Sequence, residues 1–401
     1  MDHLAPQDLE QLLSPISVET FVDDYLERQP LHVPGDPHRF SSLFRLDDVD
    51  ELLARGYFQS DDRFGVFRDG QRLQPPFHRA AAGSGRRQHE AVIASWVRER
   101  HLAGDTVVAY AIDGQFPTLR RLARAVGQAL RARVDIGLYL TPNCTRGLAA
   151  HWDYMDVMVL QLEGTKRWQL HGTGQRLPVK PRTRRFSQSV DTAETTADVV
   201  LSPGDLLYLP RGTTHQVTAE DRQSLHLTVG IHRPQWHELL GDLLYAMAPE
   251  EIELRRSVPI GDADRLTHAR ALLRRCADRI GPDALTSAIR CRTMPDSPLP
   301  DRQLDQALAS ETAVEDETRV VKREGVECFV ESVGDRVQLA WPGSEPASTL
   351  RAPHQVTPAL QFIARARGSF AVQQIPDAVT SQSKRVLVSR LIRAGVLKPV
   401  A

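Results

Sequence analysis

Three residues whose types and spacing suit a metal site stand in two separate parts of the chain: His151 and Asp153 in HWDYMD, and His215 after GDLLYLPRGTT. Alternate residues of an extended chain point to the same side, so His151 and Asp153 can bind one ion together. His215, from a distant strand, would complete a set of two imidazoles and one carboxylate. Non-haem iron(II) centres use that set, and it leaves coordination positions open. The alternative is a buried hydrogen bond between His151 and Asp153 without any metal.

The elements around these residues are predicted to be short strands separated by turns. Apolar runs at 134–140, 156–162, 166–170, 199–201, 206–209 and 225–231 alternate with breakers such as Glu163-Gly164 and Pro203-Gly204. Such regular spacing of strands and turns is typical of barrels and jelly rolls. We therefore expect a mainly β double-stranded β-helix of the jelly-roll or cupin kind, in which two hairpins position the three residues.

Helical patterns flank this region. Residues 17–26 and 117–133 are predicted to be helices, and 235–310 is helical in pattern. Residues 311–401 mix alternating strands with two short helices, which suggests a winged-helix-like α+β domain. The expected organisation is a barrel domain at 1–234, a helical dimerisation segment at 235–310 and the winged-helix-like domain at 311–401.

Composition excludes several classes of protein. The chain of 401 residues has 50 Lys and Arg against 51 Asp and Glu, so no overall charge favours nucleic acid or an anionic membrane. No apolar run approaches the ~18 residues of a membrane helix, and the N-terminus lacks the pattern of a signal peptide. The 4 cysteines form no CxxC pair. A cytoplasmic protein is the expectation.

Several segments resemble the JmjC ribosomal oxygenases, which are cupin-type enzymes. The resemblance lies in LYLTPNCTRGLAAHWD, HWDYMDVMVLQLEGTKRWQL, PGDLLYLPRGTTHQV and SLHLTVGIHRP, together with ISVETFVDDYLERQPLHVPG near the N-terminus. It covers most of residues 14–260. Beyond residue 260 it rests on the layout of the elements alone.

The resemblance implies an iron(II)- and 2-oxoglutarate-dependent oxygenase. His151, Asp153 and His215 would be the metal ligands and the catalytic centre, and Lys166 would pair with the distal carboxylate of 2-oxoglutarate. Thr228 matches a hydroxyl position that would bond the same carboxylate. The chain departs from some members at Gly137, where they carry Asn, and at His226, for which we expect a structural role. Lys166 as a solvated lysine and Thr228 as ordinary strand packing are the simpler alternatives.

The resemblance further implies hydroxylation of an Arg or His side chain of a ribosomal protein. A homodimer is expected from the helical segment, whose apolar face would pack against a second copy or against the barrel of the same chain; this face comprises Leu239, Leu240, Leu243 and Leu244. The basic stretch Arg182–Arg185 would line a substrate groove or simply be solvated. One alternative is tailoring of a peptide natural product or of a carrier-bound amino acid. Two others are a cupin without oxygenase activity and a DNA-binding regulator that uses the basic final helix.

Overall fold

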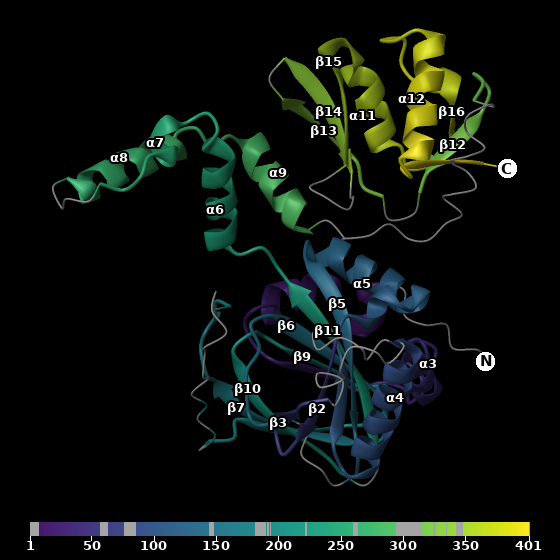
Figure 1. The fold of residues 1–401 in the computed structure, drawn as a ribbon, viewed down its shortest axis with the longest axis vertical. Helices are drawn as coiled ribbons and strands as arrows, with labels where there is room; N and C mark the ends of the chain where they lie inside the picture. The colour runs from purple at the N-terminus through teal and green to yellow at the C-terminus, as the bar shows by residue number, and fades with distance from the viewer. Residues whose placement is uncertain are drawn as a thin grey trace. The chain divides into compact units, whose positions relative to one another are not determined.

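The computed structural model describes residues 8–56, 63–75, 86–143, 148–180, 190, 192, 194–220, 223–259, 264–293, 314–323, 326–333, 335–341 and 348–400. The chain divides into two compact units, Met1–Arg233 and Pro234–Ala401. Figure 1 shows the elements of each unit. Within the described residues, no helix is both long and apolar enough to cross a membrane.

The first unit is built on two antiparallel sheets. Its strands are β1 (Leu31–Val33), β2 (Phe64–Arg68), β3 (Gln71–Leu73), β4 (Thr106–Ala109), β5 (Arg133–Thr141), β6 (Asp156–Glu163), β7 (Lys166–Thr173), β8 (Ala197–Leu201), β9 (Leu206–Leu209), β10 (Thr213–Ala219) and β11 (Ser224–His232). One sheet has the order β1-β9-β6-β11-β5-β4-β2-β3 and the other the order β10-β7-β8. The order interleaves strands far apart in the chain, as expected for a jelly roll.

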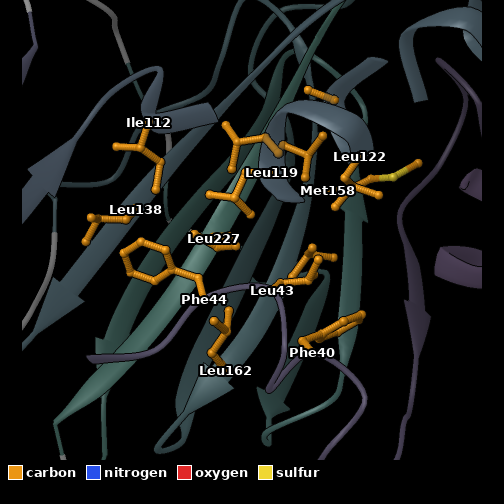
Figure 2. Close-up of a cluster of buried hydrophobic side chains, with 14 of the residues drawn as sticks. Phe40, Leu43, Phe44, Ile112, Leu119, Leu122, Leu138, Met158, Leu162 and Leu227 are labelled. Atoms are coloured by element: carbon orange, nitrogen blue, oxygen red, sulfur yellow. The ribbon is translucent and has the colours of Figure 1, made fainter. Parts of the chain in front are cut away.

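Helices cover one face of the larger sheet. They are α1 (Leu9–Leu13), α2 (Val18–Thr20) with the π-helical turn Phe21–Tyr25, α3 (Leu46–Ala54), α4 (Arg86–Leu102), the 3-10 turn Ile112–Gly114 and α5 (Pro117–Leu130). Helix α5 packs against β5. Figure 2 shows Leu119 and Leu122 of this helix in one cluster with Met158 and Leu227 of the sheet.

The alternation of side chains on β6 separates two apolar layers. Met158 and Leu160 face the cluster under the helices. Val157 and Val159 instead join Trp168 in a smaller cluster shared with the second sheet. Because successive strand residues point to opposite faces, a continuous apolar run such as DVMVLQL belongs to a strand buried on both sides. Polar side chains that lie between the two sheets are therefore exceptions among apolar neighbours.

The second unit begins with helices α6 (Trp236–Met247), α7 (Ile252–Arg255), α8 (Arg265–Ala277) and α9 (Pro282–Thr293). It continues with β12 (Arg319–Lys322), β13 (Phe329–Val333), β14 (Arg336–Trp341), β15 (Ser348–Pro353), the 3-10 turn His354–Val356, α11 (Thr357–Arg365), β16 (Phe370–Ala371), the 3-10 turn Val372–Gln374, α12 (Ser381–Arg393) and β17 (Leu397–Pro399). Two three-stranded sheets, β16-β12-β17 and β13-β14-β15, share one apolar core with α11 and α12.

Most of the strands and helices expected from the sequence are present, although their first and last residues differ from those expected. The strands β2, β3 and β4 were not anticipated, and the strand expected to carry His215 is β10. The HxD segment also differs from the expectation. Only His151 pairs, in an isolated bridge, and residues 152–155 are not a strand.

Candidate metal centre and its pocket

The structure brings together the three residues with metal-ligand chemistry. One ligand atom of each of His151, Asp153 and His215 lies within 4.8 Å of the others. Nε2 of His215 is 3.9 Å from Oδ2 of Asp153. These separations suit three donors around a single ion, with no contact short enough to be a hydrogen bond between the imidazole and the carboxylate. Among the described residues no hydrogen bond joins His151 to Asp153 either, because Nδ1 of His151 bonds the carbonyl of Ala149 instead. The arrangement therefore disfavours the metal-free alternative of a directly bonded pair.

Backbone hydrogen bonds hold the segment that carries His151 and Asp153. The N–H of His151 donates to the carbonyl of His215 at 3.1 Å, and the N–H of His215 donates back at 2.8 Å. The N–H of Gly212 donates to the carbonyl of Asp153 at 3.0 Å. The irregular stretch before β6 is thus fixed to β10 and to the turn that precedes it.

Hydrogen bonds also orient both imidazole rings. Nδ1 of His151 lies 2.8 Å from the carbonyl oxygen of Ala149, and Nδ1 of His215 lies 3.0 Å from that of Thr213. A carbonyl oxygen can only accept, so each Nδ1 carries the proton and each Nε2 keeps its lone pair free. This is the arrangement by which proteins orient metal-binding histidines.

Burial keeps the His215 ring neutral. Its side chain is almost fully buried, and desolvation, followed by the nearby His151, lowers its pKa to about 4. A neutral imidazole is the form that binds a metal, because the ion and a proton compete for the same lone pair.

A pocket between the two sheets opens onto these three residues. Besides them, it is lined by side chains from six strands and one loop: Thr106, Tyr139, Leu148, Val157, Val159, Lys166, Trp168, Val217, His226 and Thr228. Nε1 of Trp168 is buried and has no hydrogen-bond partner among the described residues. A buried donor without a partner is costly, so the pocket is suited to a polar occupant.

Lys166 places a buried amino group in this pocket. Its side chain is 1% exposed, so it is not the solvated lysine of the simpler alternative. Nζ donates to Oγ1 of Thr141 at 3.0 Å and lies 3.3 Å from Nδ1 of His226. Burial lowers the pKa of Lys166 to about 7. Among the described residues the lysine has no carboxylate partner, so an anion that enters the pocket would find it available.

The sequence placed Thr228 in the pocket but underrated His226 and missed Tyr139 and Thr141. His226 and Thr228 both line the cavity, because residues two apart on β11 share a face. The structure therefore places His226 in the pocket lining, while its expected structural role stays a prediction. The signal was available, since Leu225, Leu227 and Val229 fill the opposite, apolar face. The partners on β5 could not be found, because they depend on its register with β11.

The remaining candidates lie outside the metal centre. Asp156 is buried, accepts a hydrogen bond from the backbone N–H of Arg211, and its pKa is raised by burial to about 6. His232 pairs with Asp135 at 2.7 Å, and His237 is exposed. His171 is half-buried, and both of its ring nitrogens are buried. The basic stretch 182–185 lies outside the described residues.

Comparisons with known proteins agree with this geometry. Residues 114–239 match the JmjC domain family. The chain is 30% identical over 263 residues to the bifunctional lysine-specific demethylase and histidyl-hydroxylase NO66 of Drosophila persimilis, covering 63% of this chain and 36% of that protein. It is also 30% identical over 263 residues to ribosomal oxygenase 2 of Mus musculus, covering 62% and 54% respectively. The chain thus spans between a third and about half of the length of these relatives.

Solved structures of E. coli YcfD, a ribosomal oxygenase, share the fold. One superimposes with a TM-score of 0.55 at 17% identity and covers 96% of this chain and 98% of YcfD. A YcfD complex with cobalt and 2-oxoglutarate superimposes with a TM-score of 0.55 at 15% identity, covering 96% and 99%. At identities of 17% and 15%, the structural match shows a shared fold and no more. Residues 114–239 therefore carry a JmjC domain, and the relatives that the chain matches include a protein named a histidyl-hydroxylase and one named ribosomal oxygenase 2.

Proposed function

We propose that this protein is an iron(II)- and 2-oxoglutarate-dependent oxygenase that hydroxylates an amino-acid side chain of a ribosomal protein. The observation that carries the proposal is the ligand set itself. His151, Asp153 and His215 present one donor atom each within 4.8 Å of one another. Both histidines hold their Nδ1 protons on carbonyl oxygens, so both Nε2 atoms are available for an ion.

The donor set fits iron(II) better than the metals of other cupins. Two imidazoles and one carboxylate on one side of an ion leave the opposite side free for a cosubstrate and oxygen. When bound, iron(II) with 2-oxoglutarate and O₂ supplies the oxidising power for inserting oxygen into a C–H bond. A general acid or base among the protein's residues is not needed for that chemistry.

Lys166 is the proposed anchor of the 2-oxoglutarate tail. In a buried pocket a carboxylate needs a cation or several donors, and Lys166 is the lysine that lines the cavity. The hydroxyl of Thr228 would give a second hydrogen bond to the same carboxylate. The apolar side chains Val157, Val159 and Val217 would exclude water around the cosubstrate.

The substrate assignment comes from the relatives. NO66 is named a histidyl-hydroxylase, and YcfD and the mouse relative are named ribosomal oxygenases. We therefore infer an Arg or His side chain of a ribosomal protein as the target. A polypeptide substrate needs an approach to the metal centre, and Leu148, just before the HxD segment, lines the pocket together with the metal ligands.

The second unit is proposed to serve assembly. Helix α6 buries Leu239 and Leu243 within the unit, while Trp236, Leu240 and Tyr245 are 68%, 47% and 84% exposed. Trp236 and Leu240 lie one helical turn apart on the same side of α6, and large exposed apolar side chains that lie close together mark an interaction surface. We propose that the helical segment 235–310 pairs with a second copy of the chain, which makes the protein a homodimer.

For residues 311–401 we propose a winged-helix-like domain. The support is the small sheet β16-β12-β17, which shares an apolar core with helices α11 and α12. Two helices packed on a short antiparallel sheet are the elements of that architecture. The proposal concerns the fold of this part and assigns it no nucleic-acid ligand.

The test is turnover with a defined substrate set. Purified protein is incubated with iron(II), 2-oxoglutarate and peptides of ribosomal proteins, and succinate release and peptide mass are measured. We expect succinate together with a peptide heavier by one oxygen atom. His151→Ala should abolish both, while His237→Ala, an exposed histidine, should leave both unchanged. Equal turnover in the two variants would reject the proposal.

A further inference from the structure

The side chain of Lys166 is held from two directions inside the pocket. Nζ donates to Oγ1 of Thr141 at 3.0 Å and lies 3.3 Å from Nδ1 of His226. Oγ1 of Thr141 is in turn 3.5 Å from Oγ1 of Thr106. All four side chains are buried. A flexible four-carbon chain is thereby restricted to one direction, which lysine alone does not achieve.

The ring of His226 is fixed by its aromatic neighbours. Tyr139 stacks on it with a centroid separation of 4.9 Å and an angle of 8°. Trp168 meets it edge-on at 5.7 Å and 72°. Because one face and one edge are covered, the ring cannot turn freely, and Nδ1 stays directed at Lys166. Tyr139 and Trp168 therefore act on Lys166 through the imidazole.

When Lys166 is charged, only one assignment of donor and acceptor is possible between Nζ of Lys166 and Nδ1 of His226. A lysine ammonium has three donors and no acceptor, so Nδ1 of His226 must accept and the ring proton must sit on Nε2. Burial and the nearby Lys166 both lower the pKa of His226 well below its ordinary value, which keeps the ring neutral. Thr141 and His226 occupy two of the three N–H directions, and one is left for an anion.

We propose that His226 is a positioning residue, which holds the Lys166 ammonium so that its remaining N–H points at the distal carboxylate of the cosubstrate. This inference rests on the proposed use of 2-oxoglutarate. It assigns to His226 a part in cosubstrate affinity and none in metal binding. Without the imidazole, Lys166 would keep its hydrogen bond to Thr141 but lose its fixed direction. The affinity for 2-oxoglutarate would fall, because ordering the lysine side chain would then oppose binding.

The test compares three substitutions of His226. Asn places its amide oxygen near the position of Nδ1, Gln places it further out near Nε2, and Leu has no acceptor. Binding of 2-oxoglutarate is measured by calorimetry in the presence of manganese(II), a redox-silent stand-in for iron(II), and manganese affinity is measured separately. We expect His226→Leu to weaken 2-oxoglutarate binding about tenfold, the size of one lost hydrogen bond to a charged group. Manganese affinity should be unchanged.

The Asn and Gln variants test whether the position of the hydrogen-bond acceptor near Nζ of Lys166 matters. His226→Asn should restore most of the affinity and His226→Gln should not, because the acceptor must lie near Nζ. In turnover assays the KM for 2-oxoglutarate should rise in the Leu variant while kcat at saturation stays near that of the wild type. If the Leu variant fails to fold, shown by lost manganese binding, the Asn and Gln variants alone carry the comparison.

The outcomes separate this inference from the proposed function. Wild-type affinity in His226→Leu, or equal affinity in the Asn and Gln variants, would overturn the positioning role and leave the oxygenase proposal standing. A wild-type protein that binds manganese but no 2-oxoglutarate would reject the proposed function, and the role of His226 with it.

Discussion

His151 and His215 form an isolated antiparallel bridge, in which the backbone N–H of each donates to the carbonyl of the other at 3.1 and 2.8 Å. Their rings lie 4.4 Å apart between centroids. Two residues distant in the sequence are thus aligned by their own main chains before any ion is present. Because the backbone does this work, a side-chain substitution at either position should remove a ligand without dismantling the site.

Loss of one ligand should therefore remove metal binding while the protein stays folded. His215→Ala creates a small cavity and deletes one of three proposed donors, and a two-donor site binds a divalent ion far less tightly. We expect manganese(II) affinity, measured by electron paramagnetic resonance, to fall by at least ~100-fold. Loss of a residue that only orients a ligand already costs about 10- to 100-fold, and loss of the ligand itself should cost more. The thermal midpoint should change little. An exposed-histidine control, His237→Ala, should bind like the wild type.

Gly212 is expected to be essential for the position of Asp153. Its φ is +86°, and a Cβ there would lie 1.9 Å from the carbonyl oxygen of Gln175. Gly212→Ala must shift this turn, and its N–H would then lose the carbonyl of Asp153. We expect a destabilisation above ~1 kcal/mol in denaturant titration and weaker metal binding. Gly114→Ala is the control, because nothing lies within 4 Å of its Cβ.

The buried Lys166 predicts a dependence of 2-oxoglutarate affinity on pH. Burial lowers its pKa to about 7, and a carboxylate binds the charged form. Affinity should therefore fall as the pH rises above neutrality. In Lys166→Met, affinity should be weak at every pH. Calorimetric titration between pH 6 and pH 9 checks this, and a flat profile in the wild type would contradict it.

The same lysine predicts a change in stability with pH. Between its folded pKa of about 7 and its ordinary value of 10.5, the unfolded chain holds the proton and the folded chain does not. The free energy of unfolding therefore rises with pH across this window. Lys166→Met removes the contribution, so it should gain stability relative to the wild type at pH 6 and less at pH 9. Urea unfolding of both proteins at the two pH values measures the difference.

Asp156 is expected to be dispensable for metal binding although it stands close to the HxD segment. Burial raises its pKa from 3.8 to about 6, so the folded chain keeps a proton that the unfolded chain has lost between these values. This contribution to stability is present below pH 3.8 and disappears as the pH rises through 6. Asp156→Asn stays neutral and can still accept from Arg211. Relative to the wild type, it should gain stability at pH 7 compared with pH 4, with unchanged manganese affinity.

The proposed homodimer predicts a change of mass on substitution of α6. Trp236→Glu places a charge on a surface where the indole is 68% exposed in the single chain. If a second copy covers this face, the charge must be desolvated, and association weakens. Sedimentation should show a dimer for the wild type and a monomer for the variant. Leu102→Glu, at a side chain 86% exposed in the first unit, should stay dimeric. A monomeric wild type would end the proposal.

The sequence by itself determined the chemistry of the candidate site. His151, Asp153 and His215 are recognisable because few residue types bind iron, and because a distant histidine after a turn completes the set. It also determined most strands of the barrel, because a short apolar run bounded by glycine and proline is typical of a buried strand. These signals are local and can be read from a few neighbouring residues.

The tertiary structure alone decided which side chains meet. That Lys166 on β7 contacts Thr141 on β5 and His226 on β11 depends on how strands far apart in the chain pair. It also alone showed that His151 is joined to His215 by its backbone and that both ring nitrogens of His171 are buried. Register between distant strands is set by the hydrogen bonds and packing of the whole barrel, and a shift of one residue would turn each of these side chains to the other face.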